Sequence, residues 1–416
     1  MQERVVITGV GTVNPVGLSV QDSWENLLAG KSGIQRIQAF DPEEVGLRTH
    51  IAGEVKDFDP TEYIGKKESR KLDRFSQLAL VAANEAVAHS GLEIDDDMRY
   101  DVGTLVASGI GGAITLVDQA YTLEERGPRR VNPFTVPMLM PNAASGLISI
   151  RHGAWGPSFA TVSACASATD GIGMALDMIR SGRVKAMIAG GSEAAIIPIC
   201  VAGFEQARAL CSDSNDEPEK GSRPFDQTRS GFVLAEGAGI LILEEESFAR
   251  ERGAPILGEL AGYGAAADGY HITAPEPEGR GATHAVEGAL HNAQVNREEV
   301  SYINAHGTST QLNDRVESLT IQRVFGDRAQ RIPVSSTKSM TGHLGGAAGA
   351  LEAVVATKAV ETGWAPPTIN YETPDPECPL DTVPWEARRI DSGAVVSNSF
   401  GFGGHSSCLV FRPYAG

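Results

Sequence analysis

Runs of apolar residues alternate with amphipathic stretches along most of the chain. The short apolar runs at 5–9, 102–108 and 186–190 predict strands, because each is bounded by turn-forming residues. Residues 75–90 instead repeat their apolar positions with helical spacing. Alternating strands and helices predict an α/β fold. The apolar face of the predicted helix comprises Phe75, Leu78, Val81, Ala82 and Ala86.

The first part of the chain weakly resembles the last part. The pair at 162–163 leads into Cys165 and a predicted helix, and a similar pair at 334–335 leads into Lys338, a glycine-rich turn and another helix. This pattern predicts two similar α/β halves that face each other, with a site at their junction. The expected parts are an N-terminal half at 1–250, a C-terminal half at 251–416 and a crossover at 244–254.

Composition narrows the class of protein. The chain has 416 residues, 42% of them hydrophobic, which is enough for a large core. Its five cysteines are odd in number and form no CxxC pair, so neither a disulfide framework nor a zinc site is favoured. Free thiols indicate a reducing compartment, and we expect a cytoplasmic location.

Charge and hydropathy argue against three further classes of protein. The net charge of −18 argues against a nucleic-acid-binding surface. The first residues lack the pattern of a signal peptide. The uncharged stretch at 131–150 contains three prolines, so we interpret it as buried irregular structure rather than as a membrane span.

Cys165 has the sequence context of a nucleophile. It lies among small residues, where a predicted strand ends and a helix begins. A helix N-terminus carries partial positive charge and free N–H groups, so we expect it to lower the thiol pKa and to offer an oxyanion site. A buried structural cysteine is the plain alternative. Cys200, Cys211, Cys378 and Cys408 lack this context and are interpreted as structural.

Two of the nine histidines also follow predicted strands and enter turns rich in Gly, Ser and Thr. Neutral imidazoles of His306 and His343 beside a thiol would donate hydrogen bonds to a carbonyl oxygen as charge develops there. Lys338 would place a positive charge beside His343, and Glu352 on the following helix would anchor this network. No histidine spacing matches a metal motif such as HExxH, and we expect no metal.

The chain resembles the β-ketoacyl-acyl-carrier-protein synthases of the condensing-enzyme, or thiolase-fold, family, and among them the type II elongating enzymes. The resemblance covers essentially the whole chain, and its motifs are specific only in combination. They lie at 5–11, 72–75, 224–226 with Arg229, 236–239, 305–308, 338–349 and 398–404.

This resemblance implies a five-layered αβαβα fold with two duplicated halves, and a homodimer. It implies that Cys165 accepts the acyl group, and that His306 and His343 promote malonyl decarboxylation. It makes Lys338 the group that holds the charge state and position of His343. Phe402 would act as a gating aromatic, its N–H forming an oxyanion hole with that of Cys165.

The same resemblance implies roles for further residues and for a partner. The acidic groups of Asp314 and Glu317 would support the His306 loop. The expected partner is an acyl carrier protein, which brings its own phosphopantetheine, so no cofactor is expected. The implied phosphopantetheine contacts are Thr308 and Thr310, the implied acyl-pocket residues are Ile110 and Phe204, and Phe400 is implied to be a second aromatic near the thiol. The implied basic patch for the carrier comprises Lys66, Lys67, Arg129, Arg130 and Arg208.

The pathway stays open at this point. The chain departs from common family positions at Ser230, Ala274, His405 and Ser406, which leaves polyketide synthesis as an alternative to the fatty acid elongation that we favour. In the polyketide case the chain would pair with a chain-length factor. A non-catalytic partner subunit is a more distant alternative, which the presence of Cys165 and both histidines opposes. A thiolase is disfavoured, because thiolases use a second catalytic cysteine and one histidine.

Overall fold

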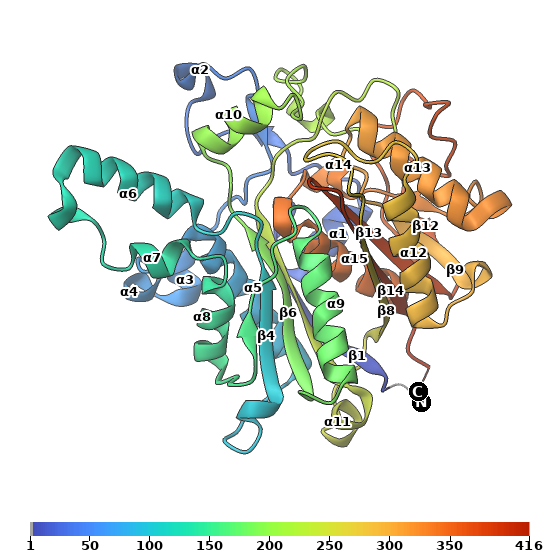
Figure 1. Ribbon diagram of the computed structural model, residues 1–416, viewed down its shortest axis with the longest axis horizontal. Helices are drawn as coiled ribbons and strands as arrows, with labels where there is room; N and C mark the ends of the chain where they lie inside the picture. Colours follow the sequence, from blue (N-terminus) through green and yellow to red (C-terminus); the bar gives the residue numbers. More distant parts are fainter. Residues whose placement is uncertain (1–2, 416) are drawn as a thin grey trace.

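The computed structural model describes residues 3–415 and contains one ten-stranded sheet. Five strands come from the first part of the chain and five from the second (Figure 1). In sheet order the first five are β5 (Ser158–Phe159), β4 (Val102–Ala107), β6 (Ala186–Glu193), β7 (Gly237–Glu245) and β1 (Val5–Val13). They are followed by β8 (Gly258–Ala267), β14 (His405–Arg412), β13 (Ala394–Gly401), β9 (Val300–Asn304) and β10 (Val334–Ser335).

The two sets of strands repeat one topology. From β1 outward, the first set has two antiparallel pairings followed by two parallel pairings. From β8 outward, the second set repeats this order. The sets join where Val6 and Ile7 of β1 pair with Glu259 and Gly258 of β8. The expected internal duplication is therefore visible in the strand order.

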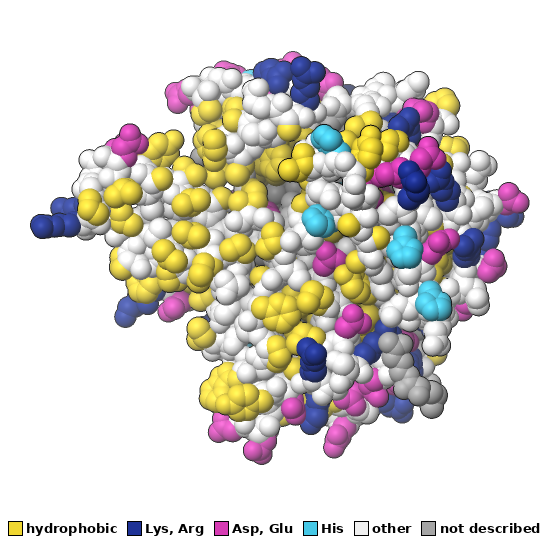
Figure 2. Space-filling view, viewed as in Figure 1, with side chains coloured by type: hydrophobic (Ala, Val, Ile, Leu, Met, Phe, Trp, Pro, Cys, Tyr) yellow, Lys and Arg dark blue, Asp and Glu magenta, His cyan; other side chains and the backbone are white. Residues whose placement is uncertain are grey.

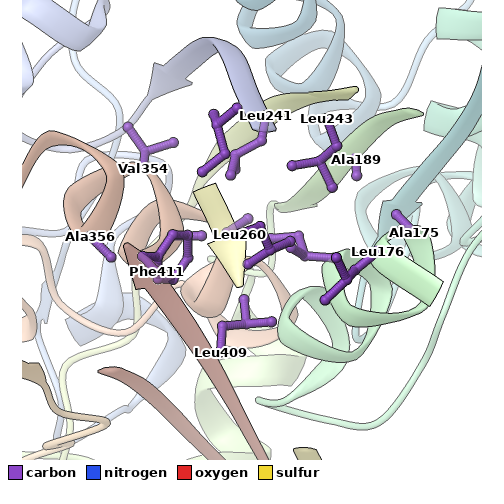
Figure 3. Packing of buried hydrophobic residues seen from close by; sticks show 14 of the residues in the cluster. Ala175, Leu176, Ala189, Leu241, Leu243, Leu260, Val354, Ala356, Leu409 and Phe411 are labelled. Carbon is purple, nitrogen blue, oxygen red and sulfur yellow. The ribbon is translucent and has the colours of Figure 1, made fainter. Parts of the chain in front are cut away.

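Helices form three layers around these strands. The middle helices α9 (Ser167–Arg180) and α15 (Ala348–Thr362) contact each other and strands of both sets. Helices α5 (Arg74–Ser90) and α8 (Ala143–His152) pack on the outer face of the first set, and α12 (Arg280–Ala293) packs on that of the second, with α13 (Gln311–Phe325) against it. This arrangement is the αβαβα layering of thiolase-like proteins. Figure 3 shows apolar side chains of α9, α15 and the strands meeting in the interior.

Helix α5 begins and ends close to the predicted positions. The side chain of Asp73 accepts a hydrogen bond from Phe75 N, and Gly91 ends the helix in the left-handed region at φ 61°. Two predicted strands were too short, because glycines were read as strand ends. Strand β1 continues through Gly11, where a β-carbon would lie 2.0 Å from Ala82 O of α5. Strand β6 continues through Gly190, where a β-carbon would lie 2.0 Å from Gly239 O.

An arm projects from the first half, on the left of Figure 1. It comprises α6 (Ala113–Arg126), the 3-10 turn η2 (Pro128–Arg130) and α7 (Thr135–Leu139). No helix within residues 3–415 is long and apolar enough to cross a membrane. The remaining helices are α1 (Val20–Leu28), α2 (Pro42–Val45), α3 (Pro60–Ile64), α4 (Lys66–Ser69), α10 (Pro198–Gln206), α11 (Glu246–Glu251) between β7 and β8, and α14 (Lys338–Thr341). Short 3-10 turns lie at η1 (Arg99–Asp101), η3 (Pro218–Lys220), η4 (Arg297–Glu299), η5 (Gly326–Arg328) and η6 (Gly345–Ala347), and small two-stranded sheets pair β2 (Gln35–Arg36) with β3 (Ile51–Ala52) and β11 (Trp364–Ala365) with β12 (Arg388–Arg389).

Candidate active site

Cys165 lies in a sharp turn between β5 and α9. The residue before it, Ala164, has φ 51°, a left-handed conformation that is uncommon for a side chain other than glycine. The hydroxyl of Ser167 stabilises the turn by accepting from Ser163 N at 2.8 Å and donating to Ala164 O at 2.7 Å. Cys165 as a whole residue is half-buried, and it lines a cavity of about 300 Å³. The turn therefore presents the sulfur at the start of a middle-layer helix, as predicted.

The two histidines come from the second half and meet at this thiol. His306 follows β9 and His343 follows α14; both are buried, and both line the cavity. Their rings are nearly perpendicular, with centroids 5.4 Å apart. The Nε2 atom of His343 lies 3.0 Å from Sγ of Cys165. Residues separated by 178 positions in the sequence thus form one hydrogen-bonding group.

Lys338 forms hydrogen bonds with His306, whereas we expected it to lie beside His343. Its Nζ donates to His306 O at 2.7 Å and lies 3.4 Å from His306 Nδ1. It also forms an ion pair with Glu352, and both side chains are only 2% exposed. The predicted anchoring by Glu352 is confirmed. The charge of Lys338 acts on His343 as expected, although the histidine to which Lys338 is hydrogen-bonded is His306. Lys338 begins the short helix α14 and His343 follows its end, and the lysine side chain reaches the turn after β9.

Buried carboxylates hold the turn that carries His306. Glu317 of α13 accepts hydrogen bonds from His306 N at 2.8 Å and from Gly307 N at 2.7 Å. Asp314, on the same helix, accepts from Phe225 N and lies 3.6 Å from Nε of the buried Arg229. Glu317 therefore supports the His306 loop as expected, and Asp314 does so by accepting a backbone hydrogen bond from Ser309 of that loop.

Burial sets the protonation states of the reacting groups. It lowers the pKa of both His306 and His343 well below the ordinary value, and the positive charge of Lys338 acts in the same direction. Both imidazoles are therefore neutral near pH 7. Burial also raises the pKa of the Cys165 thiol to about 11, although Lys338 and the Phe402 N–H favour the thiolate. The expectation of a lowered thiol pKa is wrong, because burial outweighs the charge of Lys338 and the hydrogen bond from Phe402 N–H.

The thiol and the two imidazoles each offer one donor atom, and these atoms lie within 4.8 Å of one another. Sulfur and imidazole nitrogen are ligands that zinc accepts. Lys338 opposes that use, because an ammonium group has no acceptor and the facing His306 Nδ1 must therefore carry the lone pair. The proton then lies on the other ring nitrogen, which donates a hydrogen bond and is not available to a metal. The geometry favours hydrogen bonding to a substrate oxygen.

Aromatic and hydroxyl side chains form the rest of the cavity. Phe402, between β13 and β14, lies with its ring centroid 6.5 Å from that of Phe204, and the Phe400 ring lies 5.9 Å from that of His306. Thr308 and Thr310 line the cavity with hydroxyls 3.0 Å apart. Ile110 does not line this cavity and is 41% exposed on the turn after β4.

The predicted basic patch is spread over three elements. Lys66 and Lys67 are exposed on α4, and Arg129 and Arg130 are exposed in η2. Arg208 follows α10 and lines the cavity. Figure 2 shows basic side chains at the outer tip of the arm. The structure therefore places Arg208 at the cavity, and the other four residues on or beside the arm.

Sequence reasoning missed Phe232 and Glu193. Phe232 is buried, lines the cavity and packs edge-on against the His343 ring, with centroids 5.3 Å apart. It also packs against Phe204, so aromatic contacts extend from Phe402 to His343. Glu193 is the final residue of β6, and the signal for it was an acidic residue within an otherwise apolar stretch.

The fold and the site together define a thiol-dependent acyltransferase of the thiolase-like class. Residues 2–249 match the N-terminal domain of beta-ketoacyl synthases, and residues 257–372 match the C-terminal domain. The chain belongs to the beta-ketoacyl synthase family.

Known proteins similar to this chain fall into two groups. The chain is 49% identical over 413 residues to 3-oxoacyl-[acyl-carrier-protein] synthase 2 of Synechocystis sp., with 99% of each chain covered. It also resembles a chain in the solved complex of a type II PKS acyl-carrier protein with its ketosynthase bound to the hexaketide, with TM-score 0.92, 34% identity and full coverage of both chains. The ishigamide ketosynthase/chain length factor gives TM-score 0.92 and 35% identity, again with full coverage.

Proposed function

We propose that this enzyme condenses an acyl thioester on Cys165 with malonyl-acyl-carrier protein, and that it serves fatty acid elongation. The observation that carries the proposal is the group formed by the Cys165 thiol and two neutral imidazoles, one of them 3.0 Å from the sulfur, at an accessible cavity. The two histidines and the thiol come from opposite halves, which suits a reaction that joins two substrates.

Acyl transfer comes first. The sulfur of Cys165 attacks the thioester carbonyl of the acyl carrier, the bond between that carbonyl and the carrier sulfur breaks, and the thiol proton ends on the departing carrier thiol. Because the thiol pKa is about 11, the proton must leave during the attack. The Nε2 atom of His343 is hydrogen-bonded to the sulfur of Cys165, and it would assist the transfer of that proton.

Decarboxylation then produces the carbon nucleophile. In the bound malonyl thioester, the bond to the carboxylate breaks, CO₂ leaves, and its electron pair forms an enolate. N–H groups of the neutral His306 and His343 rings stabilise the enolate oxygen as charge develops. Lys338 fixes the ring nitrogen of His306 that carries the proton, through its 3.4 Å approach to Nδ1.

Condensation follows when the enolate carbon attacks the carbonyl of the acyl group on Cys165. The N–H groups of Cys165 and Phe402 hold the oxyanion of the tetrahedral intermediate. The close approach of β13 to the thiol turn supports this role, since a β-carbon at Gly401 would lie 3.0 Å from Cys165 N. The thiolate then departs and takes up a proton, and the β-ketoacyl product remains on the carrier.

The remaining cavity residues suit the phosphopantetheine chain of the substrate. Thr308 and Thr310 hydroxyls would hydrogen-bond phosphopantetheine, which arrives on the carrier, so the reaction requires no resident cofactor. Phe402 would gate the cavity, and Phe204 would contact the acyl chain within it. Ile110 lies outside the cavity lining, so it would contact only an acyl chain that extends past the cavity to the turn after β4. The exposed Lys66, Lys67, Arg129, Arg130 and Arg208 would meet the acidic carrier protein.

In a homodimer, a second copy of the chain would cover the exposed apolar side chains of the arm. Figure 2 shows apolar side chains gathered over the arm. Within the described residues, β5 is an edge strand of the sheet and offers a second surface for pairing. A cytoplasmic location accords with five free thiols. The exposed apolar residues of the arm are Leu116, Tyr121, Leu123, Phe134 and Val136.

A ketosynthase subunit of a type II polyketide system, paired with a chain-length factor, is the second candidate function. The similarity to the type II PKS ketosynthase and to the ishigamide ketosynthase/chain length factor supports it. These two identities, 34% and 35%, are lower than the 49% identity to 3-oxoacyl-[acyl-carrier-protein] synthase 2 of Synechocystis sp., which favours fatty acid elongation.

Mass spectrometry of purified protein tests both candidates. The protein is mixed with a panel of acyl-carrier proteins, the acylated residue is located, and products are identified after malonyl-carrier protein is added. We expect saturated acyl groups on Cys165 and β-ketoacyl products from the chain alone. Protein that is inert alone, yet active with a related subunit lacking the cysteine, would instead support the polyketide function.

A further inference from the structure

Glu193 is a buried carboxylate outside the reacting group. It is 1% exposed, and no ion pair involves it within residues 3–415. Its oxygens accept hydrogen bonds from Gly109 N at 2.7 Å, from Gly346 N at 3.0 Å, from Ser108 Oγ at 2.9 Å and from Ile110 N at 3.3 Å. A buried carboxylate is costly unless such donors satisfy it, and here four of them converge on one group.

These donors belong to two turns that are distant in sequence. Ser108, Gly109 and Ile110 follow β4 in the first half, whereas Gly346 comes three residues after His343 in the second. The turns touch through backbone, since a β-carbon at Gly346 would lie 2.2 Å from Gly109 N. Glu193 therefore fixes the distance between the Ile110 turn and the His343 turn.

The arrangement parallels that of Glu317. Each carboxylate accepts N–H groups of the turn that follows a central parallel strand, β4 for Glu193 and β9 for Glu317. Glu317 thereby positions His306. By the same geometry, Glu193 positions the turn that carries Ile110.

We propose that Glu193 is a positioning residue that sets acyl-chain selectivity by holding the Ile110 turn against the turn that follows His343. The proposal rests on the proposed function, in which Ile110 contacts an acyl chain that is carried by Cys165 and extends past the cavity. Displacing the turn changes the space open to the chain, and small displacements near a reacting group have large kinetic effects.

The test is the Glu193→Gln variant, which keeps the shape but places an NH₂ group against N–H donors. Rates of Cys165 acylation are measured with acetyl, octanoyl and hexadecanoyl carriers, beside the rate of malonyl decarboxylation. We expect the ratio of kcat/KM between long and short acyl groups to change about tenfold, within the range that pocket contacts supply. Decarboxylation should change less than this ratio, because His306 and its support by Glu317 are untouched and Glu193 reaches His343 only through Gly346, three residues further along the chain.

Glu54→Gln is the matched control. The Glu54 carboxylate is also buried and accepts two backbone N–H groups, those of Gln38 and Ala39, which do not line the cavity. This variant should keep the wild-type ratio. An equal loss in Glu193→Gln for every acyl group and for decarboxylation would show a general structural role and overturn the proposal.

If Glu193→Gln does not fold, the Ser108→Ala variant tests the same proposed role of Glu193. It removes one of the four donors to Glu193 and should shift the same ratio in the same direction, by a smaller factor. Wild-type protein that never acylates Cys165 would reject the proposed function. Wild-type protein that does so, while the folded variants keep its acyl-length profile, would reject the role of Glu193 alone.

Discussion

The two halves of the molecule share a strand order but carry different chemistry. In both, a turn follows the central parallel strand, β4 or β9, and a second turn leads from the edge strand, β5 or β10, towards a middle helix. The first half places Cys165 at its edge-strand turn. The second half places Lys338 at the equivalent turn and His306 after the central strand.

The difference teaches how a duplicated fold acquires a two-substrate reaction. The topology brings four turns together at one junction, and function depends on which side chain each turn presents. One half supplies the acyl acceptor, and the other supplies the groups that generate the enolate. Substitutions in the first half should therefore impair acyl transfer, and substitutions in the second half should impair enolate formation.

Removal of the thiol should have the largest effect. In Cys165→Ala, condensation should fall to the background rate, because no acyl group can be held beside the enolate. The small side chains around the site tolerate the loss, so cooperative unfolding should persist. Intact-protein and peptide mass spectrometry with an acyl carrier measures the result. Acylation of Cys200 or Cys211 at a comparable rate would show that the first half does not act through Cys165.

Changes in the second half should separate the two half-reactions. In His306→Ala and His343→Ala, CO₂ release from malonyl-carrier protein should fall by about 10²- to 10⁴-fold, the range of positioned proton donors. Some acyl transfer to Cys165 should remain, with more lost in His343→Ala because Nε2 contacts the sulfur. Decarboxylation at the wild-type rate in both variants would contradict the division between the halves.

The sequence predicted the local parts of this comparison well. Helix α5 was placed within one residue, because its periodicity and its capping residues are neighbours in the chain. The contact of Lys338 with His306 spans 32 positions, and proximity in sequence pointed to His343 instead. The thiol pKa was misjudged for a related reason, since burial depends on strands and loops from both halves.

Glu317, whose side chain holds the His306 turn, should affect how the free energy of unfolding depends on pH. Burial raises the pKa of Glu317 to about 7, so the folded chain keeps a proton that the unfolded chain releases near its ordinary value of about 4.3. Its contribution to stability is present at low pH and is lost as the pH rises towards about 7. Glu317→Gln cannot titrate. Its free energy of unfolding relative to wild type should therefore rise between about pH 5 and 7, by at most about 1.4 kcal/mol per pH unit.

Urea unfolding at several pH values measures this difference. The exposed Glu298→Gln serves as the control and should give a curve parallel to that of wild type. A parallel curve for Glu317→Gln as well would mean that Glu317 is already ionised at low pH. In that case a charged carboxylate would hold the His306 turn at every pH measured. Burial would then not raise the pKa of Glu317 as we infer.

The smallest effect should come from the arm, which has no counterpart in the second half, where β9 leads through α13 to β10. We expect Arg129→Glu with Arg130→Glu to raise KM for carrier-bound substrate several-fold and to leave KM for a short pantetheine thioester unchanged, because only the carrier is acidic. The wild-type KM for the carrier should rise with salt, since exposed charges are screened beyond about 10 Å at about 0.1 M. Arg297→Glu with Arg331→Glu makes the same charge change on the second half and should leave both KM values unaltered. Equal effects of the two double variants would mean that net charge, rather than the arm, governs the encounter with the carrier.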